Sequence, residues 1–331
     1  MSEKVMRAVC YESYGSGSEG LKHVQVPIPK PKRDEVLVKV EASCPNPIDY
    51  KLQGGIARPI MPKKFPYIPV TDISGEVVEI GSDVQFLQVG DKVVAMLTYT
   101  NGGGLGEYAV APAKLTVKRP VEVSAVEGAG LPLAGLTALH VLTILGHVEI
   151  KSGGKAANVL VIAASGGVGH YVVQLAKLGN NHVTATCGAR NIELLKSLGA
   201  DEVLDYTTED GKMLRSPSGC KYDVVINCAT SKIPWLTYKQ NLSEQGRIVH
   251  LNPDGKTMMK SASLKLSCSR KKVTSLMMCP KKKEDLEFLV GLVKEGKLKT
   301  VVDSKYPLAE AEQAWAKMMG GHATGKIVVE P

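Results

Sequence analysis

The sequence lacks paired cysteines. Its seven cysteines are odd in number, lie scattered along the chain and include no C-x-x-C pair. Disulfide frameworks use even sets of cysteines, and structural zinc sites use closely spaced ones. The sequence therefore predicts neither kind of site, and a reducing compartment fits it best.

Long apolar runs are also missing. No run reaches the roughly 18 residues that a membrane-spanning helix needs. The first residues enter a strand pattern directly, without the apolar core of a secretory signal or the Ser- and Arg-rich composition of a transit peptide. We expect a chain with no spanning helix and no cleaved leader. Repeats and low-complexity tracts are absent as well.

The composition is that of an ordinary globular protein. Of 331 residues, 44% are hydrophobic and 22% are charged. At about 150 residues per domain, this length predicts two domains.

The positive charge is concentrated in one stretch. The net charge is +8, and residues 256–299 contain twelve basic but only four acidic side chains, so they carry the whole excess. A solvated helix face is the simplest interpretation. Contact with an anionic membrane surface is the alternative. Few aromatic residues interrupt the stretch, so no nucleic-acid partner is predicted.

The first 125 residues contain short strands separated by glycine and proline clusters. Alternating or β-branched runs occupy residues 5–11, 35–41, 73–80, 91–97 and 108–111. We therefore expect a compact and largely β first domain.

From residue 158 onward, strands alternate with helices. Strand patterns at residues 158–164, 182–187, 222–229 and 246–251 enclose helical patterns at 168–178 and 191–198, an order that predicts a doubly wound parallel sheet. A helix that opens with a capping box at Ser124 and Glu127 precedes this region. It is followed by a strand at 273–278, helices at 284–294 and 309–319, and a last strand at 326–330.

A glycine-rich loop joins the first of these strands to a helix. Its sequence is Ala163-Ala-Ser-Gly166-Gly167-Val-Gly169. Glycines at a strand-to-helix junction let the backbone approach a pyrophosphate, which the helix N-terminus attracts. We predict a dinucleotide site here; a purely structural turn is the alternative.

The end of the next strand indicates which dinucleotide binds. NAD sites place an acidic residue there for the ribose hydroxyl. This chain has Thr186-Cys-Gly-Ala-Arg190, with no acid before Glu193. Arg190 can pair with a 2′-phosphate, which favours NADPH, unless it is simply exposed at a helix start.

Motifs along the whole chain resemble one enzyme family. They are Asn46-Pro-Ile-Asp49, Val70-Thr-Asp-Ile-Ser-Gly75, Val89-Gly-Asp-Lys-Val93, Leu131-Pro-Leu-Ala-Gly-Leu-Thr137, the loop at 163–169, Leu198-Gly-Ala-Asp201 with Asp205-Tyr206, and His322-Ala-Thr-Gly-Lys326. In these the chain resembles the zinc-free quinone oxidoreductase branch of the medium-chain dehydrogenase/reductase superfamily.

The resemblance implies an α/β fold in two domains. A GroES-like, β-rich catalytic domain would comprise residues 1–125 and 279–331, and a Rossmann NADPH-binding domain residues 126–278. The active site would lie in the cleft, and a homodimer would form through the nucleotide domains. Zinc-dependent relatives bind metal near the positions of Asn46, Thr71 and Asp72. Cysteine and histidine are missing at the first two, so no metal is expected.

The resemblance also implies the cofactor contacts. They are Asn46, Lys51, Thr137, Ser165, Gly166, Gly167, Val168, Gly188, Arg190, Tyr206, Leu251, Asn252 and Lys326. Thr137 and Asn252 could instead cap a helix or a loop.

The branch reduces quinones and the C=C bond of α,β-unsaturated carbonyls, such as enones and oxylipin-like γ-ketols. Hydride from NADPH would reach the β-carbon, and the resulting enolate needs a donor and a proton. Lys51 as electrostatic donor and Tyr50 as hydroxyl donor or proton relay are the catalytic candidates. Alternatively, Lys51 only holds the cofactor and Tyr50 only lines the substrate pocket, together with Tyr67 and Tyr99.

Two further readings stay open at this point. The chain could bind NADPH without reducing a substrate, as a structural protein on a lipid surface or as a cyclase or isomerase of a plant metabolite. The resemblance implies a peripheral location at the chloroplast envelope, with the basic stretch as an electrostatic tether; the cytosol is the alternative.

Overall fold

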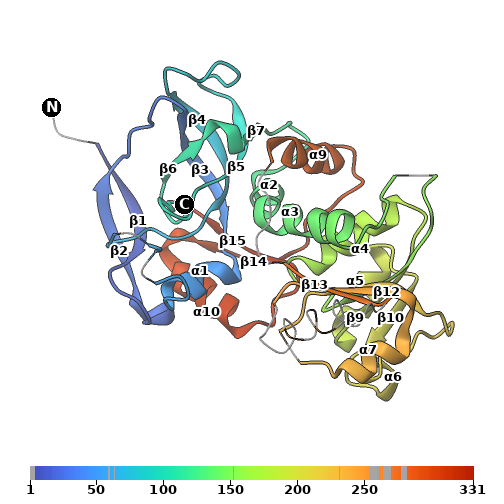
Figure 1. Cartoon of the computed structure of the whole chain (residues 1–331). Coiled ribbons are helices and arrows are strands. Elements are labelled where there is room, and N and C mark those ends of the chain that lie inside the picture. The colour runs from blue at the N-terminus through green and yellow to red at the C-terminus, as the bar shows by residue number, and fades with distance from the viewer. Residues whose placement is uncertain are drawn as a thin grey trace. The chain divides into compact units, whose positions relative to one another are not determined.

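The structure is a computed structural model of the chain. It describes all residues except 1–3, 59, 63, 152, 231, 253–258, 260, 262, 264–269 and 277–281. The chain divides into two compact units, most of whose elements are labelled in Figure 1. Unit 1 comprises Met1–Gly135, Lys281–Gly296 and Thr300–Pro331, and unit 2 comprises Leu136–Pro280 and Lys297–Lys299. The chain thus enters unit 2 inside helix α3 (Pro132–His140).

Unit 1 is built on a seven-stranded sheet in the order β14-β15-β3-β4-β5-β7, with β6 also paired to β3. A separate antiparallel pair is formed by β1 and β2. The strands are β1 (Val5–Tyr11), β2 (Leu21–Pro27), β3 (Glu35–Cys44), β4 (Asp72–Ile80), β5 (Lys92–Met96), β6 (Tyr108–Pro112), β7 (Thr116–Lys118), β14 (Val302–Pro307) and β15 (Lys326–Glu330).

Two apolar clusters form most of the core of unit 1. Val38, Ile73 and Val93 represent the first, which lies among β3, β4 and β5. In the second, Trp315 of α10 packs with Tyr11 of β1. The helices are α1 (Pro47–Gln53), α2 (Ala125–Gly130), α9 (Lys283–Lys294) and α10 (Ala311–Gly320), and short 3-10 turns lie at Gly17–Gly20, Ala113–Leu115 and Leu308–Glu310.

Unit 2 is a six-stranded sheet in which every pair of neighbours is parallel. Its order, β10-β9-β8-β11-β12-β13, places the first strand of the unit in the middle. The strands are β8 (Asn158–Ile162), β9 (His182–Cys187), β10 (Glu202–Asp205), β11 (Tyr222–Asn227), β12 (Leu242–His250) and β13 (Lys272–Ser275). The predicted doubly wound order is therefore confirmed.

Helices follow the strands of unit 2, and α4 packs against β8 and β9. They are α4 (Gly169–Leu178), α5 (Ile192–Ser197), α6 (Glu209–Lys212) and α7 (Trp235–Asn241), with a π segment at Val141–Leu145 and a 3-10 turn at Ala189–Asn191. Leu160, Val225 and Ile248 centre the core of this sheet. None of the helices traced here has the length and apolar character to cross a membrane.

Some element boundaries differ from the sequence prediction. The helix expected from Ser124 onward is two helices, α2 and α3, because Pro132 begins the second and cannot donate a backbone hydrogen bond within the first. The strand expected over 158–164 ends at Ile162, because Ala163 adopts a φ of 56°, outside the extended region. The capping box of Ser124 and Glu127 is confirmed.

Candidate functional site

The predicted cofactor residues of unit 2 gather at one edge of its sheet. Parallel strands end at a common edge, and the order reverses at β8, between β9 and β11. The loop at 163–169 follows β8, Gly188 follows β9, Tyr206 follows β10, and Leu251 follows β12. The carboxyl edge thus holds every predicted cofactor contact of unit 2 except Thr137, which is buried in α3.

Two glycines of the glycine loop differ in the space around them. A Cβ on Gly169 would lie 2.5 Å from the backbone oxygen of Ala163, so only glycine fits there. A Cβ on Gly166 would meet no described atom closer than 3.4 Å. Packing within the chain thus does not demand glycine at 166, whereas approach of a pyrophosphate does. Ser165, Gly166, Gly167 and Val168 are all partly exposed.

Hydrogen bonds and close packing join the loops that follow β8, β9 and β10. Asn191 donates to Ser165 Oγ at 3.1 Å, which ties the turn after β9 to the glycine loop. A Cβ on Gly188 would lie 3.2 Å from Tyr206 Oη, so the tyrosine ring covers this glycine. Arg190, in the turn after β9, is exposed. These two contacts hold the three loops together at the carboxyl edge.

The ends of β11 and β12 bring Asn227 and His250 together. Leu251 donates its backbone N–H to the Asn227 oxygen at 3.1 Å, and Asn252 is exposed. The Asn227 amide nitrogen lies 3.0 Å from Tyr238 Oη and 3.1 Å from His250 Nδ1. The sequence analysis did not single out Asn227, because only the pairing of β11 with β12 brings it beside His250.

Unit 1 contains a buried polar network around Asn46. Lys326 Nζ donates to Asn46 Oδ1 at 2.6 Å, and Asn46 Nδ2 donates to Asp72 Oδ2 at 2.8 Å and to the Cys44 oxygen at 3.0 Å. Asp72 Oδ2 also accepts from the backbone of Leu133 at 3.0 Å. Asn46, Asp72 and Lys326 are each at most 4% exposed. We call Asn46, Asp49, Asp72 and Lys326 the Asn46 network.

Asp49 is the second carboxylate of this network. Its Oδ2 accepts from the backbone N–H of Asn46 at 2.7 Å, which closes the first turn of α1. Burial, aided by the neighbouring Asp72 and opposed by the Asn46 N–H and Lys326, raises the pKa of Asp49 to about 7. Burial likewise raises the pKa of the Cys44 thiol to about 11.

Helix α1 presents the two catalytic candidates directly after Asp49. Tyr50 and Lys51 are half-buried, and Tyr50 packs against the core cluster that contains Tyr67. Tyr67 is only 6% exposed and donates through Oη to the Tyr99 oxygen at 2.8 Å. The structure thus brings the three predicted pocket tyrosines into one region of unit 1, although Tyr67 belongs mostly to the core.

The residues at the zinc positions of related dehydrogenases do not fit a zinc ion. At the three positions where zinc-dependent relatives bind metal, Asn46, Thr71 and Asp72 offer an amide, a hydroxyl and one carboxylate, whereas protein zinc sites use thiolate, imidazole and carboxylate groups. The Lys326 ammonium lies at hydrogen-bond distance from the Asn46 amide and would repel a cation. Across the described ranges, no three His, Cys, Asp or Glu side chains are grouped as a metal site.

The basic stretch at 256–299 is divided between the two units. Lys256, Lys260, Lys265 and Lys281 lie outside the described residues. In α9 the apolar side chains Leu286, Leu289 and Val293 are buried, while Glu284 and Lys294 are exposed. This helix therefore has the solvated charged face that the simpler interpretation predicts.

Comparison with known proteins decides the family. The model "Alcohol dehydrogenase GroES-like domain" matches residues 32–121, and the model "Zinc-binding dehydrogenase" matches residues 198–329. A chloroplast envelope quinone oxidoreductase homolog of Arabidopsis thaliana is 59% identical over 331 residues, which is the whole of both chains. The chain belongs to the quinone oxidoreductase branch of the medium-chain dehydrogenase/reductase superfamily.

Two other relatives agree with this family. An NADPH-dependent alkenal/one oxidoreductase, chloroplastic, of the same plant is 33% identical and covers 99% of this chain and 80% of its own length. The quinone oxidoreductase structure from Coxiella burnetii has a TM-score of 0.87 at 32% identity, covering 99% of this chain and 100% of that one. The predicted fold class and the chloroplast location are thereby confirmed. The protein is an oxidoreductase, and its family uses NAD(P)H.

Proposed function

We propose that this oxidoreductase uses NADPH to reduce the C=C bond of α,β-unsaturated carbonyls, or quinones, without a metal. The observation that carries the proposal is the carboxyl edge of unit 2, where the turn after β9 contains Arg190 and hydrogen-bonds to the open glycine loop, and where no acidic residue lies between the end of β9 and Glu193. Similarity to an NADPH-dependent alkenal/one oxidoreductase supports the cofactor and the substrate class.

The residues of the carboxyl edge fit this cofactor. Ser165 to Val168 would hold the pyrophosphate through backbone N–H groups at the start of α4, and Arg190 with Gly188 would hold the 2′-phosphate. Tyr206, Leu251, Asn252 and Thr137 would line the rest of the dinucleotide, and Asn46, Lys51 and Lys326 of unit 1 would contact its nicotinamide half. When bound, NADPH supplies the hydride that reaches the β-carbon.

The α1 side chains supply the remaining chemistry. Reduction at the β-carbon leaves negative charge on the carbonyl oxygen, and a positioned ammonium or hydroxyl stabilises such charge in a partly buried site. Lys51 is the ammonium that we assign to this oxygen. Tyr50 is the hydroxyl that donates or relays the proton to the α-carbon.

A single spectroscopic assay tests the proposal. The protein is mixed with NADPH and a panel of enones and quinones, and loss of the NADPH absorbance is followed. We expect oxidation with at least one class, and a rate for Lys51→Ala that is lower by about tenfold or more, with Lys51→Arg retaining most of it. Tight NADPH binding without oxidation across the panel would contradict reduction and favour the non-reducing alternative.

Unchanged turnover in Lys51→Ala would remove Lys51 from the mechanism. Exposed Lys64 provides a matched control, because Lys64→Ala removes the same charge from unit 1 outside the predicted machinery. This control variant should behave as the wild type.

A further inference from the structure

We propose that Lys326 is a positioning residue, whose buried ammonium acts through Asn46 to fix the start of helix α1 and so the placement of Tyr50 and Lys51. Its catalytic consequence rests on the proposed function. Its structural consequence does not, since it concerns the order of α1 itself.

Neighbouring strands deliver the members of the Asn46 network. Lys326 begins β15, which pairs with β3 through Val329 and Ser43. Cys44, at the end of β3, is paired with Asp72, at the start of β4. The backbone of Lys326 is itself fixed, because its N–H donates to the Val301 oxygen at 2.8 Å. The Lys326 ammonium is thus held by a residue of the sheet, and Asn46 connects α1 to it.

Asn46 is held in a single orientation. Its side-chain oxygen faces the Lys326 donor, and its side-chain nitrogen faces two acceptors, Asp72 and the Cys44 oxygen. A rotated amide would set donor against donor and acceptor against acceptor, which is costly in a buried site. The backbone N–H of the same residue is bonded to Asp49. Asn46 therefore transmits its position to the first turn of α1.

Charge makes the ammonium indispensable to this arrangement. Asp49 and Asp72 are 3% and 0% exposed, and Lys326, at 4%, is the cation bonded into their network. Removal of one partner from such a group leaves buried charge uncompensated, which destabilises its surroundings strongly. Loss of the Lys326 charge should therefore loosen the segment that the network holds, namely α1.

Hydrogen exchange of the α1 amides tests the structural claim in the full-length protein. In Lys326→Met, we expect the amides of residues 49–54 to exchange about tenfold faster or more, while those of β1 and β2 stay unchanged. Lys305→Met is the matched control, because Lys305 is an exposed lysine on the adjacent strand β14. Unchanged exchange in α1 of a folded Lys326→Met protein would overturn the proposal, whatever the enzyme reduces.

A second variant separates positioning from cofactor contact. Asp72→Asn disturbs Asn46 without removing any predicted cofactor residue, and it also serves if Lys326→Met fails to fold. We expect both variants to lower kcat with an enone by about tenfold, while their NADPH dissociation constants stay within about twofold of the wild-type value. Lys326→Arg, which keeps the positive charge, should restore part of kcat. The proposal would be overturned if Lys326→Met bound NADPH more weakly while Asp72→Asn kept a normal kcat and normal exchange of the α1 amides. That pair of results would mean that Lys326 only contacts the cofactor. A wild type that oxidises no NADPH would refute only the proposed function.

Discussion

His170 Nδ1 lies 2.9 Å from the backbone oxygen of Gly166, and the backbone N–H of His170 reaches the same oxygen at 3.2 Å. The ring is fully buried at the first turn of α4. Gln174 continues the contact, because its amide donates to the His170 oxygen and accepts from the Lys299 backbone. Two hydrogen bonds thus hold the Gly166 carbonyl toward α4.

We predict that His170→Ala weakens NADPH binding by about tenfold, because the Gly166 carbonyl loses its side-chain donor. His170→Asn, which keeps a donor nitrogen near the position of Nδ1, should lose less. Fluorescence titration with NADPH measures both dissociation constants. Equal affinity in wild type and His170→Ala would show that the backbone bond alone shapes the loop.

Arg190 provides a test of cofactor choice. A charge-assisted contact with a phosphate contributes about 1.5–3 kcal/mol, so Arg190→Ala should weaken NADPH binding by about tenfold or more and leave NADH binding unchanged. Lys196→Ala is a suitable control, since Lys196 is an exposed cation on α5 that pairs with Glu193. If Arg190→Ala weakened both dinucleotides equally, the 2′-phosphate would not be what Arg190 binds.

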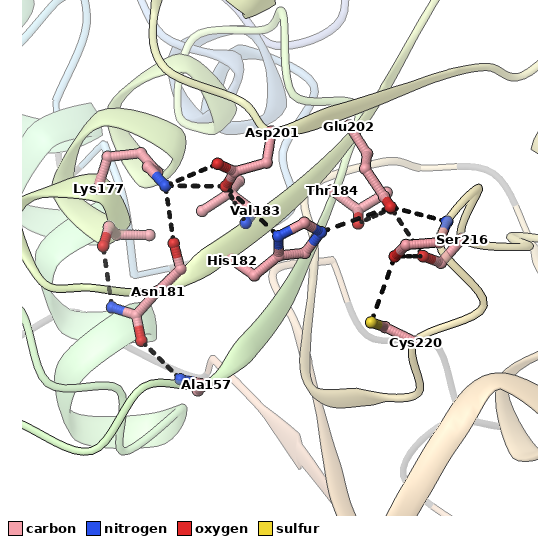
Figure 2. Close-up of polar contacts among 12 residues, drawn as sticks. Ala157, Lys177, Asn181, His182, Val183, Thr184, Asp201, Glu202, Ser216 and Cys220 are labelled. Carbon is pink, nitrogen blue, oxygen red and sulfur yellow. Dashed lines mark hydrogen bonds and ion pairs between the residues drawn. The ribbon is translucent and has the colours of Figure 1, made fainter.

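The amino ends of β9 and β10 carry a polar network on the edge of the sheet opposite to the predicted cofactor site (Figure 2). Glu202 accepts from Thr184 Oγ1 at 2.8 Å, Ser216 Oγ at 2.7 Å and the Ser218 backbone at 2.9 Å. Burial opposes ionisation, but these hydrogen bonds prevail and lower the pKa of Glu202 to about 2. The carboxylate thus fixes the loop before β11 to β10.

We predict that Glu202→Gln lowers the free energy of unfolding at neutral pH by about 2 kcal/mol. Because the folded-state pKa is depressed, this stabilisation is present above the ordinary glutamate pKa and is lost as pH falls toward about 2. Denaturant unfolding at several pH values measures it, with exposed Glu209→Gln as control. A variant with the pH dependence of the wild type would contradict the assignment.

Asp49 should give the opposite pH dependence. Its folded-state pKa is raised to about 7, so the stability that it contributes is complete below its ordinary pKa of 3.8 and is lost as pH rises through about 7. The free energy of unfolding of Asp49→Asn, relative to that of the wild type, should therefore rise by on the order of 2–4 kcal/mol between about pH 4 and pH 8. Unfolding of the exposed Asp34→Asn variant controls for surface charge. A constant difference between Asp49→Asn and wild type would show that Asp49 stays ionised.

Strands with strong alternation or continuous apolar runs could be predicted from the sequence, and β1, β9 and β15 have the predicted bounds. Strands with polar residues on an exposed face could not. Polar residues interrupt the strand pattern in β2, at Lys22 and His23, and in β14, at Asp303 and Lys305. Neither strand has a fully buried face. Four-residue β10 and three-residue β7 are too short for periodicity to reveal them.

The glycine loop and Arg190 could be found because the dinucleotide fold places their motifs at fixed points along the sequence. The Asn46 network could not be found in this way. Lys326 and Asn46 are 280 positions apart, and their hydrogen bond depends on the register of three strands. His170 gave no signal either, since a histidine in the first turn of an apolar helix does not reveal that its ring turns back to Gly166.

Strand β15 lies between β14 and β3 in the sheet of unit 1, yet it follows all of unit 2 in the chain. On the ribosome, the nucleotide-binding half can therefore be complete while the earlier-made strands still await a partner. Until β15 emerges, Ser43 at the end of β3 lacks its Val329 partner, and the Asn46 network lacks the Lys326 ammonium. The half translated first thus finishes folding last, against the usual order of synthesis.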